Sequence, residues 1–195
     1  MMKQVIPIFL ISWLLTGCSN NASTAITPLN NDDLVNQPTK NQNNKVNNIM
    51  QLISPAFKPN EKIPQKYTCD GANINPSLVI EDVPNGAKTL TLILDDPDAP
   101  GGPWLHWTVW DINATAREIA ENSVPIEAVQ GATSFGQPGY GGPCPPSGTH
   151  HYHFKLYALD AVIKLAHGAS LNELEQAMNG HIIAQAELVG LYSRK

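Results

Sequence analysis

The chain has 195 residues, of which 12 are Lys or Arg and 17 are Asp or Glu, so its formal net charge is −5. A mildly acidic chain without a cluster of basic residues is unlike nucleic-acid-binding proteins, and it has no charge pattern for electrostatic docking on anionic lipid. The composition therefore argues against nucleic acid as a partner.

Residues 1–17 have the features of a bacterial export signal. Lys3 provides a positive start, an apolar run extends from Val5 to Leu15, and small residues precede Cys18. The run is too short for a permanent membrane helix, which needs about 20 residues. We interpret the segment as a lipoprotein signal peptide, after which the cysteine becomes the lipidated N-terminus. The alternative is an ordinary secretory signal with an incidental cysteine.

The segment after the signal indicates how the protein is held at the membrane. Ser19 follows the cysteine, where Asp would favour inner-membrane retention, so the sequence predicts an outer-membrane lipoprotein that faces the periplasm. Residues 18–48 are rich in Asn, Thr, Gln and Ser, and such a segment buries too little apolar area to offset the entropy cost of ordering. We expect a disordered tether with a reach on the order of 30 Å.

The remaining residues, 49–195, have the usual size of one domain with one core. In residues 88–95, Leu90, Leu92 and Leu94 alternate with more polar positions, as in a sheet strand. Similar alternation predicts strands at 106–112 and 152–159, and strands are also expected at 50–57, 77–81 and 182–192. Short strands separated by Gly and Pro turns predict a mainly β fold, a two-sheet antiparallel β-sandwich with a few short peripheral helices.

One helix is expected near the C-terminus. Ser170-Leu-Asn-Glu173 is a capping box, and Leu171, Leu174 and Met178 share one helical face. An Asn-Gly pair at 179–180 provides the stop signal.

A loop rich in Gly and Pro, residues 140–149, precedes the strand predicted at 152–159. Its prolines fix φ and its glycines permit unusual dihedral angles, so the loop is neither helix nor regular strand. His150 and His151 lie where the loop meets the strand. Loops held by a rigid scaffold commonly carry binding residues. The alternative is a proline-rich surface turn beside a structural histidine.

Three motifs occur in order: Asp95-Asp-Pro-Asp-Ala-Pro100, Trp104-Leu-His-Trp107, and Gly142-Pro-Cys-Pro-Pro-Ser-Gly-Thr-His-His-Tyr152. Together they resemble the signature blocks of the phosphatidylethanolamine-binding protein family, also called the Raf kinase inhibitor-like family. Segments 67–71 and 181–190 resemble its bacterial branch, and the resemblance covers about residues 50–192. It implies the same sandwich fold and an anion pocket.

The resemblance implies a set of ligand-binding positions, which here are Asp96, Asp98, Trp104, His106, Gly142, Pro146, His150 and Tyr152. Imidazoles near carboxylates tend to be protonated. With a tyrosine hydroxyl and the backbone N–H groups of the glycine turn, they would form a set of anion donors. We expect a pocket for a phosphate monoester, a phospholipid head group or an acidic peptide group, without a cofactor.

Less specific roles are available to the same residues. Asp96 and Asp98 can cap the proline-rich turn, and His106 can be a satisfied core histidine. The predicted strand places His106 on one face with Thr108 and Trp110, and tryptophans are more often core than ligand wall.

One position departs from the family pattern. His151 stands where the family carries Arg, which puts in doubt an ion pair at the pocket rim. His151 and His153, with His150 nearby, make a metal site an alternative. Ser147 near His150 makes a periplasmic hydrolase another, although no G-x-S-x-G elbow is present.

The resemblance implies a non-enzymatic protein that binds ligands or inhibits other proteins. A periplasmic protein does not meet cytoplasmic kinases, so we expect either a small anionic ligand of the phosphate type or an extracytoplasmic protein target.

Two cysteines remain once Cys18 is lipidated. Cys69 lies in a turn-rich segment and Cys144 in the proline loop, and an oxidising compartment permits a bridge between them. We expect a disulfide; the alternative is two buried free thiols.

Overall fold

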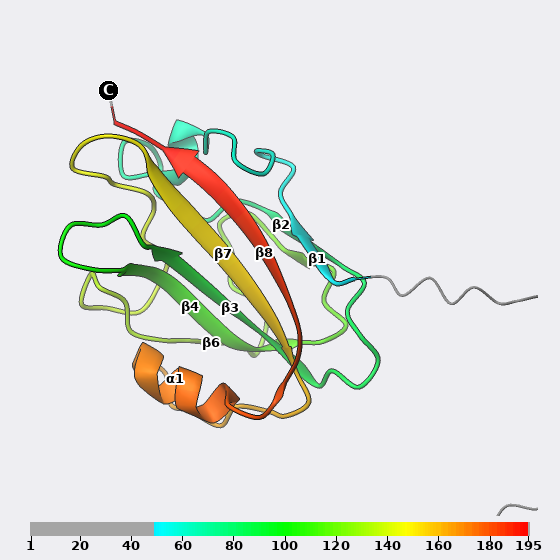
Figure 1. Cartoon of the computed structure of the whole chain (residues 1–195). Coiled ribbons are helices and arrows are strands. Elements are labelled where there is room, and N and C mark those ends of the chain that lie inside the picture. Colours follow the sequence, from blue (N-terminus) through cyan, green and yellow to red (C-terminus); the bar gives the residue numbers. More distant parts are fainter. Residues whose placement is uncertain (1–48, 195) are drawn as a thin grey trace, which may run out of the picture. The chain divides into compact units, whose positions relative to one another are not determined.

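The computed structural model describes residues 49–194, so the signal peptide, the lipidated cysteine and the tether predicted at 1–48 lie outside the described residues. The strands form a three-stranded sheet, in the order β1-β2-β5, and a five-stranded sheet, in the order β6-β4-β3-β7-β8 (Figure 1). All strand pairs are antiparallel. The strands are β1 Gln51–Ile53, β2 Leu78–Glu81, β3 Thr89–Asp96, β4 Trp104–Asn113, β5 Glu118–Ile119, β6 Val129–Gln130, β7 His150–Leu159 and β8 Ile182–Tyr192.

The main core lies between the two sheets. Leu52 and Leu78 of the smaller sheet belong to the same buried cluster as Leu92, Phe154 and Leu188 of the larger one. Burying large apolar side chains in this way stabilises a fold by roughly 1.5–3 kcal/mol for each side chain. The predicted two-sheet antiparallel sandwich is confirmed.

The central strand β3 is covered on both faces. Leu92 points into the main core, whereas Ile93 belongs to a second cluster with Trp110 of β4 and Leu174 and Met178 of the helix α1, Leu171–Met178. Figure 1 shows α1 beside the larger sheet. The predicted alternation of β3 is therefore correct, and the helix explains why its second face is also buried.

The helix begins and ends where its local signals predict. Ser170 is the N-cap, Asn179 is the C-cap, and Gly180 follows in the left-handed region with φ of 79°. The Ser170 hydroxyl accepts a hydrogen bond from the Glu173 N–H, and the Glu173 carboxylate accepts one from the Ser170 N–H at 2.8 Å. The capping box is confirmed.

Replacing the cap by Ser170→Ala is expected to lower the free energy of unfolding by about 1 kcal/mol, because the Glu173 N–H loses its acceptor. Chemical denaturation followed by circular dichroism measures the change. Glu175→Ala, on the exposed side of the same helix, is the matched control and should shift stability by less than about 0.5 kcal/mol. Equal midpoints for Ser170→Ala and the wild type would contradict the prediction.

Some predicted boundaries are wrong. The strand expected at 50–57 ends at Ile53, because Ser54 turns the chain: its hydroxyl donates to the Ser77 carbonyl at 2.7 Å and accepts from the Ala56 N–H. Strand β7 begins at His150 and not at residue 152. The two-residue strands β5 and β6 and the 3-10 helix Gln65–Tyr67 lacked a recognisable periodicity.

Within residues 49–194, α1 and the 3-10 helix are both too short to cross a bilayer, and no membrane-spanning helix is found there.

Candidate functional site

The candidate site lies at one end of the larger sheet, where three neighbouring strands each contribute a polar side chain. Asp96 is the last residue of β3, His150 is the first of β7, and His106 is near the start of β4. Because β3 runs antiparallel to both neighbours, these three positions meet at the same edge. All three residues are buried.

A β-bulge turns His106 into this site. Leu94 pairs with Trp107 and the next residue of β3, Asp95, pairs with Leu105, so β4 carries one extra residue here. The His106 ring consequently packs edge-on against Tyr152, with ring centroids 5.2 Å apart. The prediction that His106 shares a face with Thr108 and Trp110 is wrong, since Trp110 belongs to the outer cluster beside α1.

Asp96 orients His150. One carboxylate oxygen, Oδ2, accepts the His150 Nδ1–H at 2.7 Å, and the other accepts the Asp98 N–H at 2.9 Å. Asp96 therefore caps the turn after β3 and also fixes a pocket histidine.

His106 is held by the backbone and not by a carboxylate. Its Nδ1 donates to the Gly141 carbonyl at 2.6 Å, which leaves Nε2 as the free nitrogen of the ring. Burial lowers the pKa of His106, and this outweighs the opposing effects of the Gly141 hydrogen bond and of Asp96. The prediction that this ring is protonated because carboxylates lie nearby is wrong, since the cost of burying its charge is larger.

Both histidines border a cavity of about 490 Å³. Among residues 49–194, neither Nε2 atom makes a hydrogen bond and neither is sealed from solvent. The walls are mainly apolar. They include Trp104, which is 39% exposed, and Phe135, which is 44% exposed, and these two aromatic rings pack edge-to-face. The cavity is lined by Asp96, Ala99, Pro100, Trp104, His106, Phe135, Cys144, Pro146 and His150. The two imidazole Nε2 atoms in this largely apolar cleft can bind the oxygen atoms of an anion from two directions.

Three of the predicted ligand residues are placed outside this lining. Asp98 lies at the rim, where it accepts hydrogen bonds from His151. The Gly142 N–H donates to the Asn73 side-chain oxygen at 2.7 Å, and the Gly141 N–H donates to the His106 carbonyl at 3.0 Å. The expectation that the glycine turn offers free backbone donors to an anion is therefore wrong, because both N–H groups already have acceptors.

Tyr152, the third such residue, forms part of the wall behind His106. Its side chain is fully buried, and its hydroxyl has no hydrogen-bond partner within the described residues. Burial first, and then the charge of Asp96, raises the pKa of Tyr152 well above its ordinary range. The hydroxyl therefore keeps its proton at physiological pH and remains a buried donor close to the two histidines.

Four lining residues were absent from the predicted set: Ala99, Pro100, Phe135 and Cys144. The first two belong to the Asp-Pro-Asp-Ala-Pro motif but were interpreted only as a turn. Phe135 contacts the His106 ring at a centroid distance of 5.4 Å. A single large aromatic between turn residues, in Thr133-Ser-Phe-Gly-Gln-Pro-Gly139, was the available signal for it.

At the position where the family carries Arg, His151 makes hydrogen bonds to Asp98. The His151 backbone N–H and ring Nδ1 both donate to Asp98, at 2.8 and 2.7 Å, and these hydrogen bonds lower the pKa of Asp98.

His153 is separately paired with Glu187 at 2.8 Å. Between residues 49 and 194 no group of three or more His, Cys, Asp or Glu is arranged to hold a metal ion. In the same region Ser147 makes no hydrogen bond with His150.

The structure contains the disulfide expected between Cys69 and Cys144, with Cα atoms 5.4 Å apart. Two hydrogen bonds reinforce this connection. The Cys69 N–H donates to the Pro143 carbonyl at 3.1 Å, and the Tyr140 side-chain hydroxyl donates to the Tyr67 carbonyl at 2.7 Å. The loop that carries the cavity wall is thus joined to the segment around Tyr67.

Comparison with known proteins finds similar chains. The UPF0098 protein of Pyrococcus horikoshii is 51% identical over 152 residues, which are 73% of this chain and 76% of that protein. The UPF0098 protein of Aquifex aeolicus is 48% identical, over 75% of this chain and 90% of that protein.

Two solved structures share the fold. A phosphatidylethanolamine-binding protein homologue from Chlamydia trachomatis has a TM-score of 0.74 and 44% identity, over 76% of this chain and 99% of its own. E. coli YbcL, described as a new member of the mammalian family, has a TM-score of 0.71 and 35% identity, over 76% of this chain and 100% of its own. Residues 53–193 match the phosphatidylethanolamine-binding protein family. The chain therefore belongs to this family.

Proposed function

We propose that this protein binds a small anion of the phosphate monoester or phospholipid head-group type in the cavity between His106 and His150, and that it does not transform its ligand. The observation that carries the proposal is the pair of Nε2 atoms that lack hydrogen-bond partners within the described residues. Each ring is fixed through Nδ1, one by the Gly141 carbonyl and the other by Asp96, so little rotamer entropy is lost when a ligand binds.

The apolar walls suit an acidic group that carries an organic substituent. Charge-assisted hydrogen bonds are strong when water is excluded, and Trp104, Phe135 and Pro146 limit access of water to the histidines.

Titration with inorganic phosphate and with phosphorylethanolamine tests the proposal. We expect dissociation constants in the high micromolar to millimolar range, as a few charge-assisted bonds in an open cleft allow. In a two-dimensional NMR titration the largest shifts should fall on His106, His150 and the Trp104 indole. Shifts confined to the opposite face of the sheet, around Lys155 and Glu187, would contradict it.

We further propose that Cys18 anchors the domain by its lipid on the periplasmic side of a bacterial outer membrane, through the tether 18–48. The support is the sequence Leu15-Thr-Gly-Cys18 and the Ser19 that directly follows the cysteine, where Asp would favour inner-membrane retention. Under this proposal the ligand is periplasmic, and a protein target, if the pocket binds an acidic peptide group, is extracytoplasmic.

Cys18→Ser is expected to block lipidation and to move the protein from the detergent phase to the aqueous phase in Triton X-114 partitioning. Cys69→Ser, which removes a cysteine of the folded domain, is the control and should leave the partitioning in the detergent phase. Aqueous partitioning of the wild-type protein would contradict the anchor.

A further inference from the structure

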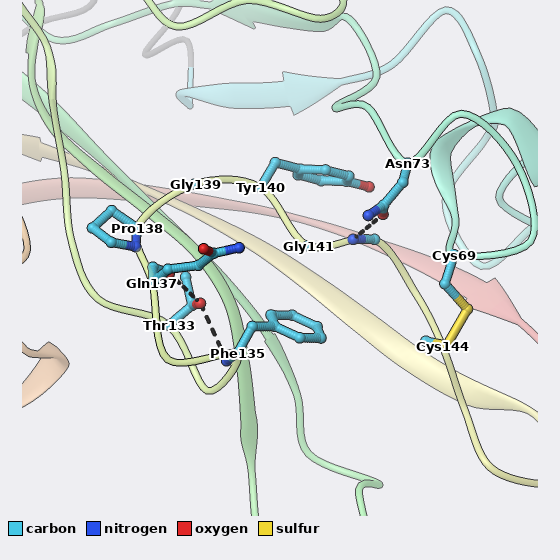
Figure 2. A pocket seen from close by; sticks show the side chains of 11 residues that line it. Cys69, Asn73, Thr133, Phe135, Gln137, Pro138, Gly139, Tyr140, Gly141 and Cys144 are labelled. Atoms are coloured by element: carbon cyan, nitrogen blue, oxygen red, sulfur yellow. Dashed lines mark hydrogen bonds between the residues drawn. A yellow bond between two sulfur atoms is a disulfide. The ribbon is translucent and has the colours of Figure 1, made fainter.

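A second cavity lies next to the histidine pocket. It has a volume of about 170 Å³ and shares two lining residues, Phe135 and Cys144, with the larger cavity. Figure 2 shows it between the loop 133–141 and the segment that carries Cys69 and Asn73. The two cavities therefore adjoin at Phe135 and at the cysteine of the disulfide.

The walls of this second cavity combine polar and apolar groups and carry no charge. No Asp, Glu, Lys, Arg or His lines it, and burial raises the pKa of Tyr140 far above its ordinary range, so this phenol stays neutral. An ammonium group placed here would lack a counter-ion, and an anion would lack a cation.

Two carboxamides provide the hydrogen-bonding groups. The Asn73 side-chain oxygen accepts the Gly142 N–H, which leaves the amide NH₂ group free, and the Gln137 carboxamide has no partner within the described residues. In Figure 2 the Gln137 side chain extends into the space between Tyr140 and Phe135. Amide groups both donate and accept, which matches the hydroxyl groups of a polyol.

The place of the Phe135 ring beside the second cavity depends on Gly141. An added Cβ on Gly141 would lie 2.1 Å from the ring, so only glycine at 141 lets the ring occupy this place. The loop that carries the ring turns at Gly136 and Gly139, with φ of 82° and 122°. The ring is nearly half exposed.

We propose that the two cavities form one bipartite site, in which the histidines take the phosphate and the second cavity takes a small, neutral, hydroxylated ester substituent. This inference rests on the proposed anion-binding function and names its ligand class. The volume of about 170 Å³ corresponds to several water molecules, each of about 30 Å³ in the liquid, so a three-carbon polyol such as the glycerol of glycerol phosphate fits.

The test compares inorganic phosphate, glycerol phosphate and phosphorylethanolamine by isothermal titration calorimetry on the full chain. We expect glycerol phosphate to bind at least about fivefold more tightly than the other two, which is the effect of one additional neutral hydrogen bond. Gln137→Ala should abolish this preference and leave the affinity for inorganic phosphate unchanged, because Gln137 does not line the histidine pocket. Gln137→Glu should reverse it in favour of phosphorylethanolamine, because the new carboxylate provides a counter-ion.

The outcomes separate the two proposals. Binding of all three ligands with equal affinity, or a glycerol preference that survives in Gln137→Ala, would overturn the bipartite site and leave the anion pocket intact. If none of the three ligands binds, both proposals are overturned. Since Gln137 is exposed and its side chain makes no hydrogen bond in the described region, the two variants are expected to fold normally.

Discussion

Removal of the Cys69–Cys144 disulfide is expected to lower the free energy of unfolding of the folded domain by roughly 4 kcal/mol, less any strain that the bridge introduces. The two cysteines are 75 residues apart in the sequence. Closing a loop of this length restricts the unfolded chain strongly, which is the main source of the stabilisation in the chain-entropy account.

The effect should extend to ligand affinity. Cys144 lines both cavities, and the bridge acts together with the Gly142–Asn73 and Tyr140–Tyr67 hydrogen bonds to hold the glycine and proline loop. Without the covalent link, the backbone around Gly141 is expected to move more freely, and with it the carbonyl that orients His106.

Thermal unfolding of the double variant Cys69→Ala/Cys144→Ala measures the stability effect, which should lower the melting temperature by about 10 °C or more. Both cysteines are exposed, so a reductant should reach the bridge in the wild-type protein and reproduce the change. The double variant itself should be insensitive to the reductant, which provides the control. A wild-type melting temperature that is unaffected by complete reduction would contradict the prediction.

Phosphate binding is expected to weaken by up to about tenfold per pH unit above about pH 7, where phosphate monoesters are mainly dianions. Burial holds the pKa of His106 below its ordinary value, so the ring is neutral in the free protein under these conditions. Its Nε2 then carries a lone pair that would face a phosphate oxygen. A hydrogen bond between these two atoms therefore requires that one proton is taken up on binding, either by the His106 ring or by the phosphate.

The sign of the pH dependence follows from this proton. The complex holds one proton more than the separated partners, so lowering the proton concentration tenfold lowers the affinity by up to about tenfold. By reciprocal linkage, the bound anion raises the pKa of His106. Calorimetry in buffers with different ionisation enthalpies should therefore detect proton uptake on binding.

Variants assign the effect to the pocket. His106→Ala and His150→Ala should each reduce the affinity for phosphate below detection, because each removes one of the two available Nε2 atoms. His181→Ala is the matched control, since this exposed histidine pairs with Asp160 at 2.8 Å away from the cavity lining, and it should bind like the wild type. A titration of His106→Ala that retains the affinity and pH dependence of the wild type would show that the anion site lies elsewhere.

The sequence alone determined those features whose signals are local. The capping box at Ser170 and the stop at Asn179-Gly180 lie within a few residues of the helix ends that they specify, so the helix was predictable. The strand predicted at 182–192 has the same bounds as β8, Ile182–Tyr192, and three motifs in order indicated the family and hence the sandwich. The anchoring signal at Cys18 is also local, and it remains a prediction.

Only the tertiary structure decided how the site works, because its determinants are distant in the sequence. His106 faces the pocket through a bulge that exists only in the register between β4 and β3. The Gly142 N–H is taken by Asn73, 69 residues away, and so is not free for an anion. The charge of His106 depends on burial by the assembled sheets, which a count of neighbouring carboxylates in the sequence does not reveal. These properties arise from packing between segments, and a single sequence carries no local pattern for them.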